Sequence, residues 1–243
     1  MAVSRQNNEA EGDNMNIASE MNLGSIIDLS HTIVPEKEEY GCVLDVKNIE
    51  EVFPQYKRAP DAWYVIGKIE MNTHCGTHIE APYHHDKDGI DIASLPMERL
   101  VGLATCIDFS DYGTNDEITF TDLATRCESL QQGEAVIFDC GVAKHYGTER
   151  GHDRPWFDPE GIKWLVEEKN VWSVGTDATG IEVRTATGGS TGRQPNHEYL
   201  LGNGVPLIES LTNLSQLHGQ HFTLMVLPVK IKGADAFPAR VIA

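Results

Sequence analysis

The order of apolar and polar residues along the chain predicts strands that alternate with helices. Trp63–Met71 alternates between apolar and polar positions, as a half-buried strand does. Short apolar runs typical of buried strands follow it, at residues 103–109, 135–139, 171–175, 222–229 and 239–241. The sequence therefore predicts at least six strands, distributed over most of the chain.

Helices are expected between these strands. Residues 121–130 place apolar side chains on one helical face, with Thr121 or Asp122 as the cap. A second helix is expected to begin at Asp158-Pro159-Glu160, where a cap, a proline and an acid occupy the first turn. A third, shorter helix is expected over residues 208–217. Because strands and helices alternate without a linker, residues 25–243 are predicted to form one α/β domain with a mixed sheet.

Composition narrows the functional classes. The chain has 243 residues and a formal net charge of −18, which opposes binding to nucleic acids. No apolar run approaches the ~20 residues of a membrane-spanning helix. Residues 1–24 are polar and are expected to form a flexible arm without a secretory signal. Five scattered cysteines indicate reduced thiols, so we expect a cytoplasmic protein with a small-molecule substrate.

Three potential metal ligands lie within a short segment, His74-Cys75-Gly76-Thr77-His78-Ile79-Glu80. Gly76, and Pro82 just beyond the segment, disfavour a helix here, and in an extended chain His78 and Glu80 share a face. A turn at Gly76 would bring His74 to them. Two imidazoles and a carboxylate suit Zn²⁺, Mn²⁺ or Fe²⁺, and three ligands leave positions open for water. The segment therefore predicts a catalytic metal site, and the alternative is a polar loop that bonds to backbone.

Further ligands are available downstream, at His197 and Glu209. Glu209 follows the apolar run Val205-Pro206-Leu207-Ile208, where a charge requires a partner. A cation would be one such partner. Alternatively, Glu209 is a surface residue that opens the following helix, where the helix dipole favours an acid. The residues alone leave both interpretations open.

The segment HCGTHIEAPYH, residues 74–84, resembles the HxGTHxDxPxH signature of the metal-dependent cyclase-like hydrolases, the family of bacterial kynurenine formamidase and isatin hydrolase. His197 and Glu209 are similar to that family's second ligand pair. The segments 28–31 and 230–240 are similar to its two ends. The resemblance thus covers residues 25–243 and leaves out only the N-terminal arm.

The resemblance implies a swivelling β/β/α fold, a homodimer or homotetramer, and hydrolysis of a small amide, formamide or lactam. It implies that His74, His78 and Glu80 bind one divalent metal, Zn or Mn, and that Glu80 bridges to a second metal held by His197 and Glu209. It further implies that His84 is the general acid/base. A histidine can perform this role because its pKa lies near neutrality.

Two departures from the family pattern concern the metal and the substrate. Glu80 replaces the usual Asp, and its extra methylene puts the bridge to a second metal in question. Residues 33–41 lack the Trp-Pro-Gly segment of kynurenine formamidases, which argues against that exact substrate. Trp63 and Tyr64 are candidates for an aromatic pocket, and Arg193 for contact with a substrate carboxylate.

Two other functions remain open at this point. One is a metal-dependent cyclase or dehydratase that acts on a polyketide-like carbonyl compound. The other is a non-catalytic metal-binding protein of the same fold, although a base beside the metal argues against it.

Overall fold

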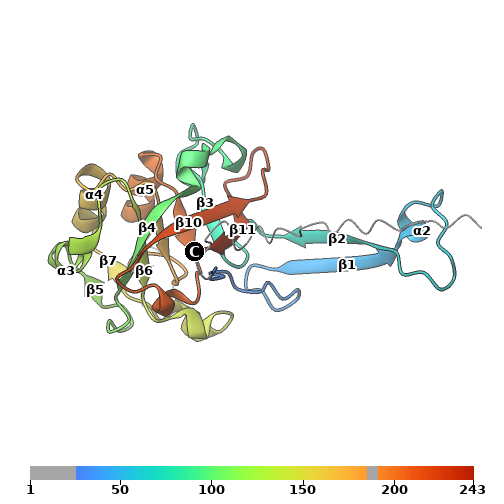
Figure 1. Cartoon of the computed structure of the whole chain (residues 1–243), viewed down its shortest axis with the longest axis horizontal. Coiled ribbons are helices and arrows are strands. Elements are labelled where there is room, and N and C mark those ends of the chain that lie inside the picture. The colour runs from blue at the N-terminus through green and yellow to red at the C-terminus, as the bar shows by residue number, and fades with distance from the viewer. Residues whose placement is uncertain (1–25, 185–190) are drawn as a thin grey trace, which may run out of the picture.

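A closed barrel of seven strands forms the centre of the computed structural model, which describes residues 26–184 and 191–243 (Figure 1). Around the barrel the strand order is β10-β11-β3-β9-β8-β6-β4. The strands β4, β6, β8 and β9 run parallel to one another, whereas β3, β10 and β11 pair antiparallel with their neighbours. Their bounds are β3 (His78–Glu80), β4 (Val101–Asp108), β6 (Ala135–Asp139), β8 (Val174–Thr176), β9 (Leu207–Glu209), β10 (His221–Pro228) and β11 (Ala236–Ile242).

The barrel wall separates two hydrophobic cores. Strand β6 is buried along its whole length, and alternate residues contribute to each core. Ile137 packs with Ile79 and Ile208 in one core, whereas Phe138 packs with Phe157 in the other. A strand that is buried on both faces shows a continuous apolar run rather than an alternating one, which is the pattern that the sequence has at this position.

Three helices cover the second core: α3 (Phe120–Arg126), α4 (Pro159–Glu167) and α5 (Pro195–Gly202). Figure 1 shows them together on one side of the barrel. Thr119, rather than Thr121 or Asp122, caps α3, because its side chain accepts from the backbone N–H of Asp122. Asp158 caps α4 as predicted. The prediction of a single α/β domain with a mixed sheet is therefore confirmed.

The third predicted helix, over residues 208–217, is wrong. Its first residues lie in β9, and only Leu214–Gln216 forms a short 3₁₀ helix. Leu207 and Ile208 are both fully buried, one in each core, so this run of apolar residues belongs to a strand with two buried faces. Periodicity does not distinguish such a strand from a short buried helix.

A long β-ribbon projects from the barrel, on the side away from the three helices (Figure 1). It consists of β1 (Cys42–Asn48) and β2 (Val65–Met71), which pair antiparallel, with the one-turn helix α2 (Ile49–Val52) at its far end. Directly paired residues share a face, so Leu44 and Ile69 lie on one side and Val43 and Glu70 on the other. The sequence predicted β2 but not β1.

The remaining elements are short. Strands β5 (Glu117–Ile118) and β7 (Trp156–Phe157) form a small parallel pair. The 3₁₀ helices span Pro82–His84, Ile92–Ser94, Met97–Arg99, Cys127–Ser129, Ala143–His145, Glu149–His152 and Leu214–Gln216. All five cysteines are buried and free. Among the described residues, no helix has the length and apolar character needed to cross a bilayer. The predicted arm at residues 1–24 lies outside the described residues.

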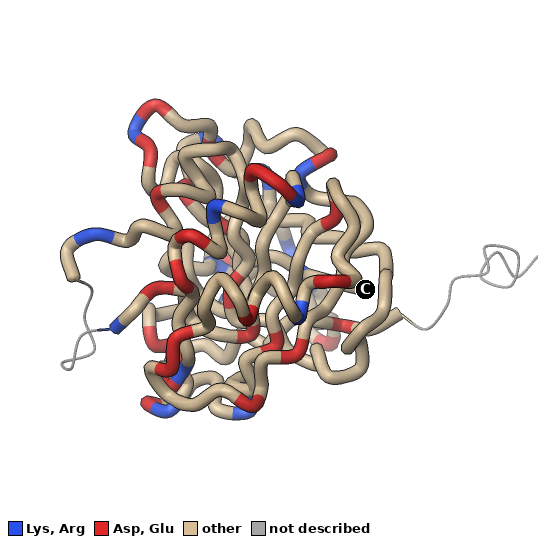
Figure 2. The backbone as a smooth tube through the Cα atoms, turned by 90° about the vertical axis from the view of Figure 1, so that its left-hand side faces the viewer, with Lys and Arg blue, Asp and Glu red and all other residues tan. Residues whose placement is uncertain are grey.

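Acidic residues outnumber basic ones in this chain, 37 to 19, which gives the net charge of −18. Figure 2, which views the helical side of the molecule, shows Asp and Glu positions spread over this side, with the fewer Lys and Arg positions scattered among them. No basic patch is visible on that side.

Candidate metal centre

Strand β3 presents two of the predicted ligands on one face of the barrel wall. Side chains alternate along a strand, so His78 and Glu80 point away from the interior while Ile79 packs into the core. His78 is 3 % and Glu80 2 % exposed. Thr77, at the start of the strand, donates its hydroxyl to the carbonyl of Ser210 and accepts from the backbone N–H of His31. This hydroxyl ties β3 to two neighbouring segments.

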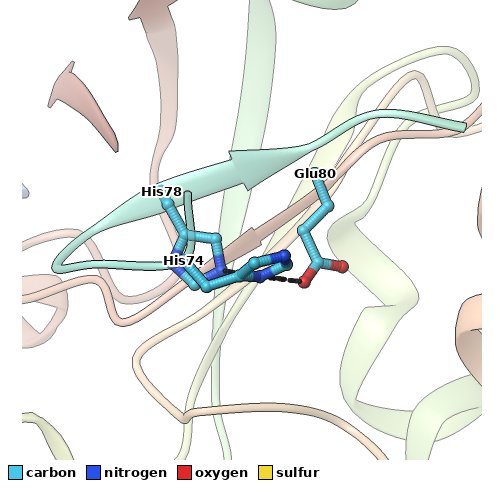
Figure 3. Close-up of side chains that lie close together, drawn as sticks. All are labelled: His74, His78 and Glu80. Carbon is cyan, nitrogen blue, oxygen red and sulfur yellow. Dashed lines mark hydrogen bonds and ion pairs between the residues drawn. The ribbon is translucent and has the colours of Figure 1, made fainter. Parts of the chain in front are cut away.

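A turn at Gly76 brings His74 to the same face, as the sequence predicted. Gly76 has φ +69°, and a Cβ there would lie 2.6 Å from Ile33 Cγ1, so glycine is required on both counts. His74 Nδ1 lies 3.1 Å from His78 Nε2 and 3.1 Å from Glu80 Oε1 (Figure 3). The first group of three donors is therefore assembled by a single turn and strand.

Strand β9 and helix α5 supply the second group. Glu209 pairs directly with His78 across β3 and β9. His197, on α5, places Nε2 3.6 Å from Glu80 Oε2 and 3.4 Å from Glu209 Oε1. Glu209 is buried in a strand and does not open a helix, so the structure favours the interpretation in which its charge has a partner at the site.

Glu80 belongs to both groups. Its Oε1 faces His74 and His78, whereas its Oε2 faces His197. Within each group the donor atoms lie within 4.8 Å of one another. Glu80 Oε2 and Glu209 Oε1 are buried, with no hydrogen-bond partner among the described residues. Unpartnered buried carboxylate oxygens are costly, and a divalent cation between them would remove that cost. The donor set fits a divalent cation.

The outer nitrogen of each of the three candidate ligand histidines is held by an oxygen. His78 Nδ1 donates to the carbonyl of Gly76 over 2.9 Å, His74 Nε2 to Asp235 over 3.0 Å, and His197 Nδ1 to Glu182 over 3.0 Å. Each bond leaves the other ring nitrogen directed at the donor cluster. This is the usual arrangement around metal-binding histidines, because it sets both the tautomer and the ring orientation.

The histidines and carboxylates of these groups shift one another's pKa values. Burial acts to lower the pKa of His74, but Glu80 and Asp235 outweigh it and raise this pKa to about 9. Burial likewise opposes protonation of His197, but Glu182, Glu209 and Glu80 raise its pKa to about 10. Hydrogen bonds from His74 and His78 hold the pKa of Glu80 well below its usual range despite its burial. Without a cation, protons therefore compensate the carboxylates.

His84 lies at the edge of this cluster. It ends the 3₁₀ helix Pro82–His84, and its Nε2 is 3.7 Å from Glu80 Oε1. Its Nδ1 donates to Asp235 Oδ2 over 3.0 Å. Asp235 thus orients both His74 and His84, and their hydrogen bonds, with that of Thr73, overcome burial and lower its pKa to about 2. Sequence reasoning gave Asp235 no role, since nothing in its spacing connects it to the histidine segment.

The model of the putative cyclase family matches residues 27–183, which is more than half of the chain. The protein belongs to this family. A relative named kynurenine formamidase, from Erythrobacter litoralis, is 28 % identical over 177 residues, covering 73 % of this chain and 76 % of that protein.

Two solved structures are similar to this chain over 90 % of its length. Isatin hydrolase A from Labrenzia aggregata, bound to benzyl benzoate, superposes with a TM-score of 0.71 at 27 % identity and covers 90 % of this chain and 92 % of that one. A potential metal-dependent hydrolase with cyclase activity gives a TM-score of 0.66 at 26 % identity, with 90 % and 96 % coverage. The match therefore extends beyond the segment that carries the histidines.

The donors of this cyclase-family chain line a cavity of about 350 Å³. The cavity is also lined by residues that the sequence did not single out, among them Tyr40, Thr179, Gln194 and Arg154. Tyr40 comes from the loop that departs from the kynurenine formamidase pattern. Two of the three acids of that loop are engaged elsewhere, Glu38 with the hydroxyl of Tyr146 and Glu39 with His152.

The three predicted substrate contacts do not lie at the cavity of this chain. Trp63 and Tyr64 are at the far end of the β-ribbon, 82 % and 49 % exposed. They immediately precede β2, so the extension of the ribbon carries them away from the donors. Arg193 is exposed and pairs with Glu198 on α5. These three residues do not line the cavity of the single chain, and their contact with a substrate stays a prediction.

Proposed function

We propose that this protein is a divalent-metal-dependent hydrolase that cleaves the C–N bond of a small amide, formamide or lactam. The observation that carries the proposal is the pair of donor groups that share Glu80, with His84 beside them at one cavity. The names of the relatives, kynurenine formamidase and isatin hydrolase, support this class of reaction.

The proposed roles of the residues follow from where each side chain is held. A bound divalent cation supplies a Lewis acid that polarises the scissile carbonyl and lowers the pKa of water. His74 and His78 would hold it on one side of Glu80, and His197 and Glu209 would hold a second cation on the other. The nitrogen and oxygen donors suit Zn or Mn.

His84 is the proposed general acid/base. Because Asp235 accepts from Nδ1, the neutral ring keeps Nε2 free on the side that faces Glu80 and the cavity. Nε2 can take a proton from the attacking water and return it to the leaving nitrogen. Asp235 stabilises the protonated ring between these two transfers, in addition to orienting it.

The test combines metal content with product analysis. Elemental mass spectrometry on protein purified without a histidine tag is expected to find one or two equivalents of Zn or Mn per chain. Formanilide, N-formylkynurenine and isatin then serve as test substrates, and hydrolysis adds one water to the product mass. Failure to take up metal would refute the proposal. Products without added water would favour a cyclase or dehydratase instead.

We also propose that the protein acts as a homo-oligomer in which the β-ribbon contacts a second copy. Leu44, Val46 and Ile69 form an apolar face on the ribbon and are 44–58 % exposed. A two-stranded ribbon is marginally stable in water without packing on one face. A second copy of the chain would provide that packing.

A further inference from the structure

Arg154 occupies an unusual position for a cation in this protein. It follows the 3₁₀ helix Glu149–His152 and lines the cavity that holds the metal donors, yet it is only 6 % exposed. A guanidinium is always charged, and buried arginines are nearly always paired with an acid. Arg154 has no carboxylate within ion-pair distance anywhere in residues 26–184 and 191–243.

Backbone carbonyls fix one corner of the guanidinium. Nη1 donates to the carbonyl of Glu182 over 2.7 Å and to that of Pro155 over 3.3 Å. Nε is buried without a partner, and no hydrogen bond from Nη2 is found among the described residues. Two carbonyls orient the group, and the carboxylates of Glu209 and Glu182 act on its charge only from beyond ion-pair distance, so Arg154 can still bind an anion directly.

The free corner lies beside the metal donors. Gly180 has φ +133°, and an added Cβ would lie 2.8 Å from Arg154 Nη2 and 3.6 Å from Glu209 Oε1. The space beside Gly180 is therefore close both to Nη2 of Arg154 and to the candidate donor oxygen of Glu209. Gly180 keeps this point open, since any side chain there would block it and would require a strained backbone.

Among the described residues that line the cavity, Arg154 is the one permanent cation. Besides this arginine, the donors and His84, the lining consists of Tyr40, Asn72, Thr179, Gly180, Gln194 and Ser210, which are neutral, and Glu182, whose carboxylate is taken by His197. An anionic group that enters the cavity would therefore meet its charge partner at Arg154, beside the candidate metal donors.

We propose that Arg154 binds an anionic group of the substrate, so that the enzyme prefers amides that carry a carboxylate close to the scissile bond. This inference rests on the proposed function and names its substrate class. Arg154 acts here as a specificity-determining residue, because it contacts a part of the substrate that does not react.

A matched pair of substrates tests the preference. N-formylanthranilate and formanilide differ by one ring carboxylate. The native enzyme is expected to favour N-formylanthranilate in kcat/KM, and Arg154→Gln to reduce that preference about 10- to 100-fold, as expected for loss of a charged hydrogen bond. The loss should fall mainly on KM, with formanilide turnover retained. Arg154→Lys should restore part of the preference.

Arg150→Gln is the control for charge, since Arg150 lies in the same segment but is exposed and pairs with Asp153. It should leave the preference unchanged. An equal loss of kcat/KM for both substrates in Arg154→Gln, or no preference in the native enzyme, would overturn the proposal. Melting temperature and metal content show whether each variant is folded and loaded.

A binding measurement separates this inference from the proposed reaction. Calorimetry with benzoate and benzamide on the metal-loaded protein requires no turnover. Benzoate should bind more tightly, and Arg154→Gln should weaken benzoate by at least about tenfold while benzamide is unaffected. Equal benzoate affinity in both proteins would show that the carboxylate does not use Arg154. If Arg154→Gln does not fold, Arg154→Lys is measured instead: it should weaken benzoate by a smaller factor and leave benzamide unaffected, and unchanged benzoate affinity would overturn the proposal.

Discussion

His78 and Glu209 face each other directly across β3 and β9, with Nε2 of one 3.6 Å from Oε2 of the other. The next pair along the strands, Ile79 and Ile208, is fully buried in the core. A register slip of one residue would exchange the faces, placing the isoleucines at the donor site and the donors in the apolar core. Core packing therefore fixes the relation between two donors that are far apart in the sequence.

Glu80→Ala is expected to remove metal from both groups, because Glu80 directs one oxygen toward each. The metal affinity should fall by more than about tenfold, because mutation of residues that only orient a metal ligand already costs about 10- to 100-fold. Elemental analysis after dialysis measures it, with exposed Glu117→Ala as the control. Unchanged metal content would remove Glu80 from the donor set. Glu80→Asp shows whether the shorter side chain still reaches both groups.

His84→Ala should retain metal but lower kcat about 10²- to 10⁴-fold, the usual contribution of general acid–base catalysis. Loss of turnover without loss of metal is expected because His84 Nε2 lies 3.7 Å from Glu80 Oε1, whereas His74 Nδ1 lies 3.1 Å from it. Steady-state kinetics and metal analysis are measured on the same preparation. His145→Ala, at a histidine remote from the cavity, should match the native enzyme. Native-like turnover in His84→Ala would exclude the acid/base role.

Asp235→Asn should weaken both metal binding and turnover, since one carboxylate oxygen orients His74 and His84 together. The expected cost is about 10- to 100-fold in affinity or activity. In the metal-free variant the pKa of His74 should fall, because Asp235 helps to raise it. NMR titration of the imidazole signals measures this change. If neither the pKa nor the affinity changes, Asp235 has no orienting role.

The metal-free protein should lose stability as pH rises from about 6.5 to about 10. The pKa of His197 is raised to about 10 and that of His74 to about 9, from about 6.5 in the unfolded chain. The stabilisation from their protons is complete below pH 6.5 and disappears as pH passes through the folded values. Metal displaces these protons, so its apparent affinity should rise over the same range.

Thermal unfolding of chelator-treated protein at several pH values tests this dependence. His197→Gln should flatten the pH dependence, because it removes the group with the higher pKa. A native protein whose melting temperature is constant from pH 6.5 to 10 would contradict the expected coupling between the histidines and the buried carboxylates.

Leu44→Lys should shift the protein toward the monomer, because it places a charge on the apolar face of the ribbon. Val43→Lys is the matched control, since Val43 is adjacent and exposed but lies on the face opposite Leu44. Light scattering coupled to size exclusion measures the mass of each variant. Equal masses for the two variants, or a native monomer, would contradict the proposed contact between copies.

Much of the barrel, and the clustering of the candidate donors, could be predicted from the sequence. The histidine segment lies in one short stretch, so its geometry follows from local turn and strand rules. Helix α5 was missed because its apolar pattern is weak, and β9 because a strand with two buried faces has no period. Asp235 reaches His74, and Arg154 reaches the cavity, only through the closed barrel and its loops, which no local pattern encodes.

Closure of the barrel also determines where backbone hydrogen-bonding groups remain available to other chains. Each of its seven strands has neighbours on both sides, so none presents an open edge. In the described part of the chain, the unpaired strand edges belong to the ribbon β1–β2 and the short pair β5–β7. Strand addition from another chain, whether in assembly or in aggregation, is therefore restricted to these two places, and the ribbon is the longer of them.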